Sequence, residues 1–212
     1  MFLPSGQGVT HPASRHRLEK LIAERLRPGA DKAAIGARIW DLLGEEWAVM
    51  FTDLSGFSRN VAEFGIIQFL QTIYESVRLF VPLIDANDGI LLKAEADSLL
   101  VIFRRPDHAM SCAIAMQRAT ADYNKIAAAD EQILVCIGLG YGPMLRIGDE
   151  DVFGAEVNAA SKLGEDTAGP GEILVTDNFR QELGDDAGLG FAPFDVEVAG
   201  IDACFRVSYR LR

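Results

Sequence analysis

Residues 47–58 read WAVMFTDLSGFS, and this stretch decides how the chain folds. Its first five residues are apolar and predict a buried strand, and the polar turn after them leads into a helix expected over residues 60–85. Asp53 therefore stands where a buried strand ends, which makes its carboxylate a candidate ligand for a hard cation. The backbone N–H groups of Gly56 and Phe57, at the start of the helix, are candidates for binding phosphate. Taken alone this motif is weak, because an Asp that caps a turn is the more frequent case.

Short apolar runs alternate with helical patterns over the rest of the chain. The polar step at residues 95–97 separates two apolar strands and predicts a hairpin, and the tail predicts a second one. Hairpins force antiparallel pairing, and no GxGxxG turn follows the first strand, so an α+β sheet covered by helices is favoured over a doubly wound parallel sheet. The further elements expected, in order, are strands at 90–93 and 98–103, a helix at 107–128, a strand at 132–140, a helix at 155–166, a strand at 171–175, a short helix at 176–183 and a hairpin within 191–210.

A helical leader is expected before this domain. Apolar residues recur at helical spacing over residues 15–26, and Pro28-Gly29 ends the pattern. Asp31 is a candidate cap for a second helix, which Gly44 would end. We therefore divide the chain into a mobile start and helical leader over residues 1–46 and a main domain over residues 47–212. Packing against the core is the expected role of the leader helices.

Composition excludes several classes of function. The 31 acidic residues outnumber the 20 basic ones and give a formal net charge of -11, which argues against nucleic acid as a partner. No apolar stretch approaches the roughly 18 residues that a membrane helix needs, and the first residues do not resemble a signal peptide. Three cysteines lie far apart without metal-binding spacing, so we expect reduced core thiols and a cytoplasmic protein.

A second motif is the polar step of the first hairpin, Lys93-Ala94-Glu95-Ala96-Asp97. Lys93 follows one apolar strand, and Asp97 begins the next. Charged groups inside a run that is otherwise apolar need partners or a metal. The ordinary alternative is a solvated hairpin tip.

A third motif runs from Asp151 to Lys162, with Asn158 between them. If residues 155–166 are helical, Asn158 and Lys162 stand at i and i+4 and share one face. An amide and a cation on one face make a candidate phosphate clamp. The alternative is a solvent-exposed polar stripe, which is common.

Together, the order and spacing of the three motifs resemble the class III adenylate and guanylate cyclase family. The resemblance extends from about Trp47 to about Val207. It also includes the strand GLGYGPM at 138–144 and the segment AGPGEILVT at 168–176. The resemblance implies a ferredoxin-like core and a head-to-tail homodimer with composite sites between the subunits. It further implies an enzyme that converts ATP to cyclic AMP and pyrophosphate.

The resemblance also assigns roles to particular residues. Asp53, Asp97 and the backbone carbonyl of Leu54 would bind two divalent metal ions, Mg or Mn, an arrangement that suits in-line attack of the ribose 3′-oxygen on the α-phosphate. Lys93 and Asp151, from the partner subunit, would bind the purine. A donor-only Lys and an acceptor-only Asp complement N1 and N6 of adenine, although the same groups in swapped positions would also serve guanine. Guanylate cyclases carry other residue types here, so the family order favours ATP.

The phosphate-binding residues depart from the family pattern at several points. Asn158 matches the residue that orients the ribose, but Lys162 stands where the family usually has Arg facing the transition-state phosphate. Arg offers a planar fork, whereas Lys offers one hydrated point charge. Ala199 stands where a Lys that binds triphosphate is frequent, and Ala96 stands where Gly usually precedes the metal-binding Asp.

These departures leave a second function open, a degenerate cyclase-homology domain that senses nucleotide or dimerises without turnover. The retained Asp53, Asp97, Lys93, Asp151 and Asn158 favour catalysis. A polymerase-palm-like diguanylate cyclase would need a hairpin with paired glycines and acids, which the sequence lacks. A nucleic-acid-binding ferredoxin-like module is disfavoured by the acidic charge and by the lack of aromatic residues interleaved with basic ones.

Overall fold

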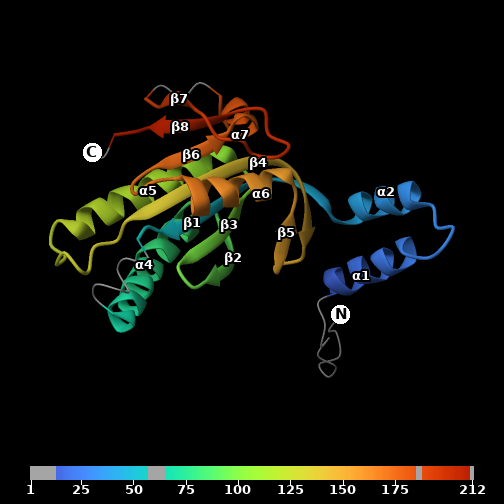
Figure 1. Ribbon diagram of the computed structural model, residues 1–212, viewed down its shortest axis with the longest axis horizontal. Helices are drawn as coiled ribbons and strands as arrows, with labels where there is room; N and C mark the ends of the chain where they lie inside the picture. Colours follow the sequence, from blue (N-terminus) through green and yellow to red (C-terminus); the bar gives the residue numbers. More distant parts are fainter. Residues whose placement is uncertain (1–12, 57–64, 185–187, 211–212) are drawn as a thin grey trace, which may run out of the picture.

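The computed structural model describes residues 13–56, 65–184 and 188–210 and centres on one twisted, mixed sheet (Figure 1). The strands follow the order β2-β3-β1-β4-β6-β8-β7, and β5 pairs with the end of β4. Within this sheet only β4 and β6 pair in parallel. The strands are β1 (Gly44–Leu54), β2 (Ile90–Glu95), β3 (Ser98–Phe103), β4 (Val135–Ile147), β5 (Asp151–Phe153), β6 (Ile173–Thr176), β7 (Gly190–Phe194) and β8 (Cys204–Ser208).

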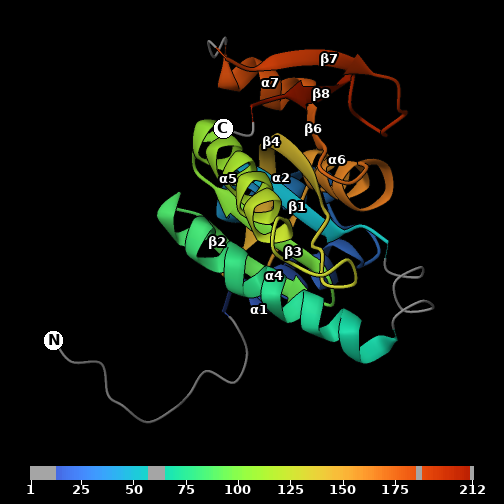
Figure 2. The same ribbon diagram turned by 90° about the vertical axis from the view of Figure 1, so that its left-hand side faces the viewer.

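The first half of the domain confirms the α+β, ferredoxin-like expectation. The chain runs β1, α4 (Ile66–Ala86), β2, β3, α5 (Pro106–Asn124), β4, and these strands lie in the order β2-β3-β1-β4. Both strand-helix-strand crossings place their helix on the same face, so α4 and α5 lie side by side (Figure 2). The hairpin of β2 and β3 is antiparallel, as its polar turn predicted.

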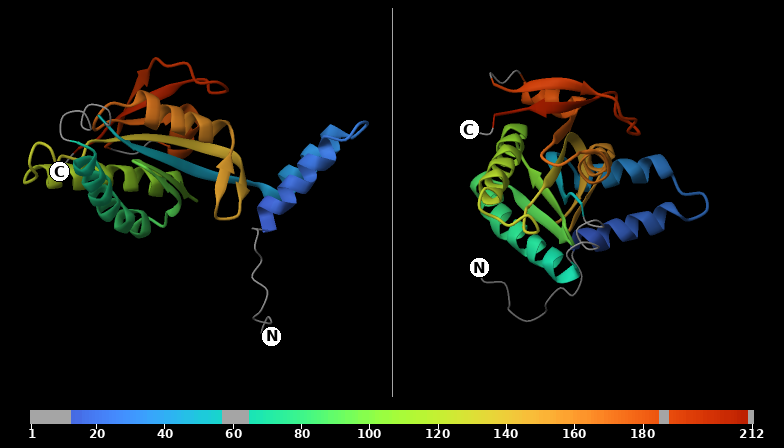
Figure 3. Two further views of the ribbon diagram at one scale, coloured as in Figure 1. Left: turned by 60° about the horizontal axis from the view of Figure 1, so that its bottom comes forward. Right: turned by 60° about the vertical axis from the view of Figure 1, so that its left-hand side comes forward.

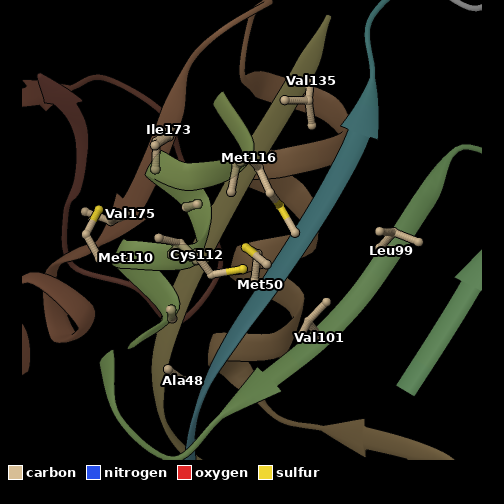
Figure 4. Close-up of a cluster of buried hydrophobic side chains, with 14 of the residues drawn as sticks. Ala48, Met50, Leu99, Val101, Met110, Cys112, Met116, Val135, Ile173 and Val175 are labelled. Atoms are coloured by element: carbon tan, nitrogen blue, oxygen red, sulfur yellow. The ribbon is translucent and has the colours of Figure 1, made fainter. Parts of the chain in front are cut away.

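The main core lies between this helical layer and the sheet. Alternation along β1 sends Ala48 and Met50 to the helical face, where they meet Met116 and Cys112 of α5 (Figure 4). Burial of such large apolar side chains stabilises a domain by about 1.5–3 kcal/mol each. Cys112, Cys136 and Cys204 are all buried free thiols, in line with the expected core role.

The opposite face of the sheet carries α6 (Ala155–Ser161) and then one π-helical turn, η1 (Lys162–Thr167). Glycine lets this segment approach the strands closely. A Cβ atom on Gly138 of β4 would lie 2.1 Å from the carbonyl oxygen of Ala160, and one on Gly164 would lie 2.7 Å from that of Phe51. The backbone of η1 therefore rests directly on β1 beside Asp53. The sequence predicted one regular helix over residues 155–166, and the π-helical turn is a departure from it.

The leader forms a helical hairpin of α1 (Ala13–Arg25) and α2 (Lys32–Leu43) beside the sheet (Figure 3). The Asp31 side chain accepts hydrogen bonds from the backbone N–H groups of Ala33 and Ala34, which confirms the predicted cap. Leu21, Ile35 and Ile39 form a separate small core that also includes Ile147 at the end of β4. Residues 1–12, in the start that we expected to be mobile, lie outside the described residues. No helix of residues 13–56, 65–184 and 188–210 has the length and apolar character that crossing a membrane requires.

Candidate active site

A cavity of about 260 Å³ opens on the sheet face that α4 and α5 leave free. Apolar side chains of β1, β3, β5 and α6 form its floor, among them Phe51, Leu100 and Val157. Its polar side chains are Lys93, Glu95, Ser98, Asp151, Asn158, Ser161 and Glu165. The second and third sequence motifs therefore meet in one place, although they are far apart in the chain.

Lys93 and Asp151 form an ion pair across this cavity. Lys93 stands just after an irregularity in edge strand β2, and Asp151 begins β5, which follows the turn after β4. Lys93 Nζ lies 2.8 Å from Asp151 Oδ2, and the side chains are 33% and 15% exposed. The other carboxylate oxygen of Asp151 accepts the backbone N–H of Val152. The two partners are thus held in place and still reach the cavity with remaining donor and acceptor positions.

Asp53 lies beside the cavity and near two other acidic groups. Its neighbours Thr52 and Leu54 are buried, while the Asp53 side chain is only partly buried. Ser98 Oγ donates to Asp53 Oδ1 at 3.4 Å. Burial and, to a smaller extent, the charges of Asp97 and Glu165 together raise the pKa of Asp53 to about 6. The folded chain therefore disfavours the ionised form of this carboxylate.

Such a carboxylate fits a divalent cation. Asp53 has no cationic partner among the described residues, and two further negative charges act on it. A bound cation would relieve this repulsion, and carboxylate oxygens are the ligands that Mg²⁺ and Mn²⁺ prefer. In the described part of the chain, no three His, Cys, Asp or Glu side chains gather as a ready-made metal cluster.

Asp97 lies in the turn between β2 and β3, next to a strained residue. Ala96 has a φ of +51°, in the left-handed region that favours glycine. Glycine, the residue expected at this position from the family resemblance, adopts this conformation without strain. The turn keeps this geometry with Ala, at a cost of about 1 kcal/mol for the side chain.

Of Asn158 and Lys162, only Asn158 lines the cavity. Lys162 Nζ instead lies 2.9 Å from Asp166 Oδ2, in an exposed pair within η1. Gly56 forms the turn after β1 with a φ of +92°, and Phe57 lies outside the described residues. Ala199 lies in the loop before β8 and offers no cationic group there. The structure thus brings together Lys93, Asp151 and Asn158, and it leaves Lys162 turned to a neighbour.

Two carboxylates that sequence reasoning missed have clear but different surroundings. Glu165 lines the cavity from η1 and accepts a hydrogen bond from Ser161. Glu156 is buried and accepts from Thr176 Oγ1 at 2.7 Å and Asn178 Nδ2 at 2.6 Å. The latter is a satisfied structural group. Glu165 carried no sequence signal, because its place depends on the π-helical turn.

The raised pKa of Asp53 predicts how pH acts on the metal-free protein. A carboxyl whose folded pKa of about 6 exceeds the unfolded value of 3.8 binds more protons when folded, so its cost appears as pH rises through that window. A pKa difference of this size corresponds to about 3 kcal/mol in the free energy of unfolding. Because Asp53 is partly exposed, we expect a smaller loss of stability, about 1 kcal/mol. Asp53→Asn should therefore raise the urea midpoint at pH 7.5 in the presence of EDTA and have a much smaller effect at pH 4.

The exposed Asp166→Asn variant is the control for this experiment and should show no comparable gain. A lower urea midpoint for Asp53→Asn at pH 7.5 would contradict the electrostatic interpretation of this site.

Comparison with known proteins assigns the chain to a family. Residues 44–200 match the adenylate and guanylate cyclase catalytic domain. The chain belongs to that family. It is 29% identical over 136 residues to the putative adenylate cyclase 3 of Rhizobium meliloti, covering 63% of this chain and 22% of the relative. The chain thus spans about a fifth of that relative's length.

Solved cyclase structures share the fold. The adenylate/guanylate cyclase/hydrolase from Silicibacter pomeroyi is 27% identical with a TM-score of 0.68, and the match covers 77% of this chain and 95% of that one. The adenylyl cyclase CyaB from P. aeruginosa is 19% identical with a TM-score of 0.65, covering 79% and 95%. This second likeness concerns the fold alone.

Proposed function

We propose that the chain is an adenylate cyclase that converts ATP to cyclic AMP and pyrophosphate. The Lys93–Asp151 pair in the cavity carries this proposal, because its remaining donor and acceptor complement N1 and N6 of adenine. Guanylyl cyclases occur among the similar structures, so the choice of base rests on these two side chains and not on the fold.

The family resemblance, together with their chemistry, suggests roles for the other residues. Asp53, Asp97 and the carbonyl of Leu54 would hold two divalent ions, Mg or Mn, and such ions would lower the pKa of the attacking hydroxyl and neutralise phosphate charge. The Asn158 amide at the cavity wall orients the ribose. Lys162 supplies a cation to the phosphate when it leaves Asp166, and an exposed ion pair costs little to break.

We also propose that two copies of the chain form each site. Asp53 and Asp97 do not line the cavity that holds Lys93, Asp151 and Asn158, which supports a division of these groups between subunits. The outer side of α4 exposes Ile66, Ile67, Leu70 and Tyr74, at 50%, 75%, 52% and 71%. An apolar surface of this kind supports a protein contact.

A nucleotide-sensing or dimerisation module without turnover is the second candidate. The observation that favours it is the Lys162–Asp166 pair, which turns the phosphate-facing cation away from the cavity.

Product analysis separates the two candidates. Purified protein incubated with ATP or GTP and with Mg²⁺ or Mn²⁺ should form cyclic AMP from ATP in excess over cyclic GMP from GTP. Asp97→Ala should abolish the product while circular dichroism stays unchanged. Absence of any cyclic nucleotide under all four conditions would favour the sensor, and a preference for GTP would contradict the roles of Lys93 and Asp151.

A further inference from the structure

Glu165 completes a polar wall along one side of the cavity. Asn158, Ser161 and Glu165 follow one another at intervals of three and four residues through α6 and η1, and all three line the cavity. The wall therefore presents an amide, a hydroxyl and a carboxylate in succession. The roles proposed above use only the amide.

The Glu165 carboxylate is held in place but not neutralised. Ser161 Oγ donates to its Oε2 atom, and Oε1 has no partner among the residues that the structure describes. Lys162, which precedes Glu165 by three residues, pairs with Asp166 instead. Within the described residues, Glu165 thus offers a fixed and charged acceptor at the cavity.

The chemistry of this acceptor limits what it binds. An ionised carboxylate accepts hydrogen bonds only, and it repels a triphosphate. A nucleotide with its base at Lys93 and Asp151 and its ribose at Asn158 offers two hydroxyl donors. The 3′-hydroxyl must face the α-phosphate for attack, so the 2′-hydroxyl is the donor that remains.

We infer that Glu165, held by Ser161, accepts a hydrogen bond from the ribose 2′-hydroxyl and selects ribonucleotides over 2′-deoxyribonucleotides. This inference rests on the proposed function, because it takes a bound nucleotide as its starting point. Carboxylates bind ribose hydroxyls in other nucleotide sites, since a charged acceptor strengthens the hydrogen bond. Loss of such a bond lowers affinity by about 10-fold or more.

Equilibrium binding of two nucleotides that cannot cyclise tests the inference. 3′-DeoxyATP keeps the 2′-hydroxyl and 2′,3′-dideoxyATP lacks it, and neither carries the attacking group. With Mn²⁺ present, wild-type protein should bind 3′-deoxyATP about 10-fold more tightly. Glu165→Ala should bind both within about 2-fold of each other, and Glu165→Gln, an uncharged acceptor of the same shape, should lie between.

Asp166→Ala is the matched control, because Asp166 is the adjacent carboxylate and does not line the cavity. It should keep the wild-type ratio. An unchanged ratio in Glu165→Ala, or an equal loss of affinity for both nucleotides, would overturn the inference and leave the cyclase proposal intact. Failure of wild-type protein to bind either nucleotide, together with no cyclic product from ATP, would overturn both.

Discussion

Asp53→Ala subunits and Asn158→Ala subunits should each be inactive alone and regain cyclase activity when mixed. In the proposed dimer, each site takes Asp53 from one subunit and Asn158 from the other, so either homodimer is damaged at both sites. A mixed dimer has one site with both groups intact and one with both lost. We expect each homodimer to lose at least about 10²-fold in kcat. An equal mixture should recover to about a quarter of wild-type activity, since half of the dimers are mixed and each has one working site.

Mixing Asp53→Ala with Asp97→Ala provides the matched control. Both carboxylates belong to the same side of the site, so every site in that mixed dimer lacks one of them and no activity should return. Subunit exchange is verified with two affinity tags. Failure of the first mixture to recover despite exchange, or turnover of ATP by an isolated monomer, would show that these residues act within one chain.

Much of the fold could be predicted because it depends on local patterns. The five apolar residues before Thr52, the polar step before Ser98 and the cap at Asp31 each have a short-range physical cause. These patterns predicted β1, the β2–β3 hairpin and α2. The antiparallel pairing expected of hairpin strands led to the α+β class. The strands proved longer than their apolar runs: β1 begins at Gly44 and β4 extends to Ile147.

The remaining features depend on contacts that no local pattern reveals. At the π-helical turn η1, Gly138 and Gly164 allow two backbones to lie in close contact, and Glu165, the next residue, lines the cavity. The short strand β5 is defined only by its pairing with β4. Lys93 and Asp151 are 58 residues apart, so their pairing was implied by the family resemblance and not by spacing. The structure shows that Lys93 Nζ and Asp151 Oδ2 lie 2.8 Å apart.

The role of Lys162 gives the second large expected effect. Lys162→Ala should lower kcat for ATP by about 10²-fold, because one charged donor to the transition-state phosphate is lost. The KM should change by less than about 3-fold, since that interaction strengthens only as charge develops. Steady-state kinetics on the intact dimer measure both constants. If the chain is a nucleotide sensor without turnover, neither the wild type nor Lys162→Ala should form cyclic AMP.

Variants of Asp166 test whether its ion pair with Lys162 keeps the ammonium group from the phosphate. The Lys162–Asp166 pair is exposed at 47% and 61%, so it stabilises the turn by no more than about 1 kcal/mol. Asp166→Ala should therefore keep kcat or raise it slightly, by freeing the ammonium group. Lys162→Arg should keep the kcat that Lys162→Ala loses, because the guanidinium fork matches two phosphate oxygens. Adding Asp166→Ala to Lys162→Arg should raise kcat further, because it removes the competing carboxylate. Full kcat in Lys162→Ala would place this side chain outside the reaction and leave the phosphate without a cation from this helix.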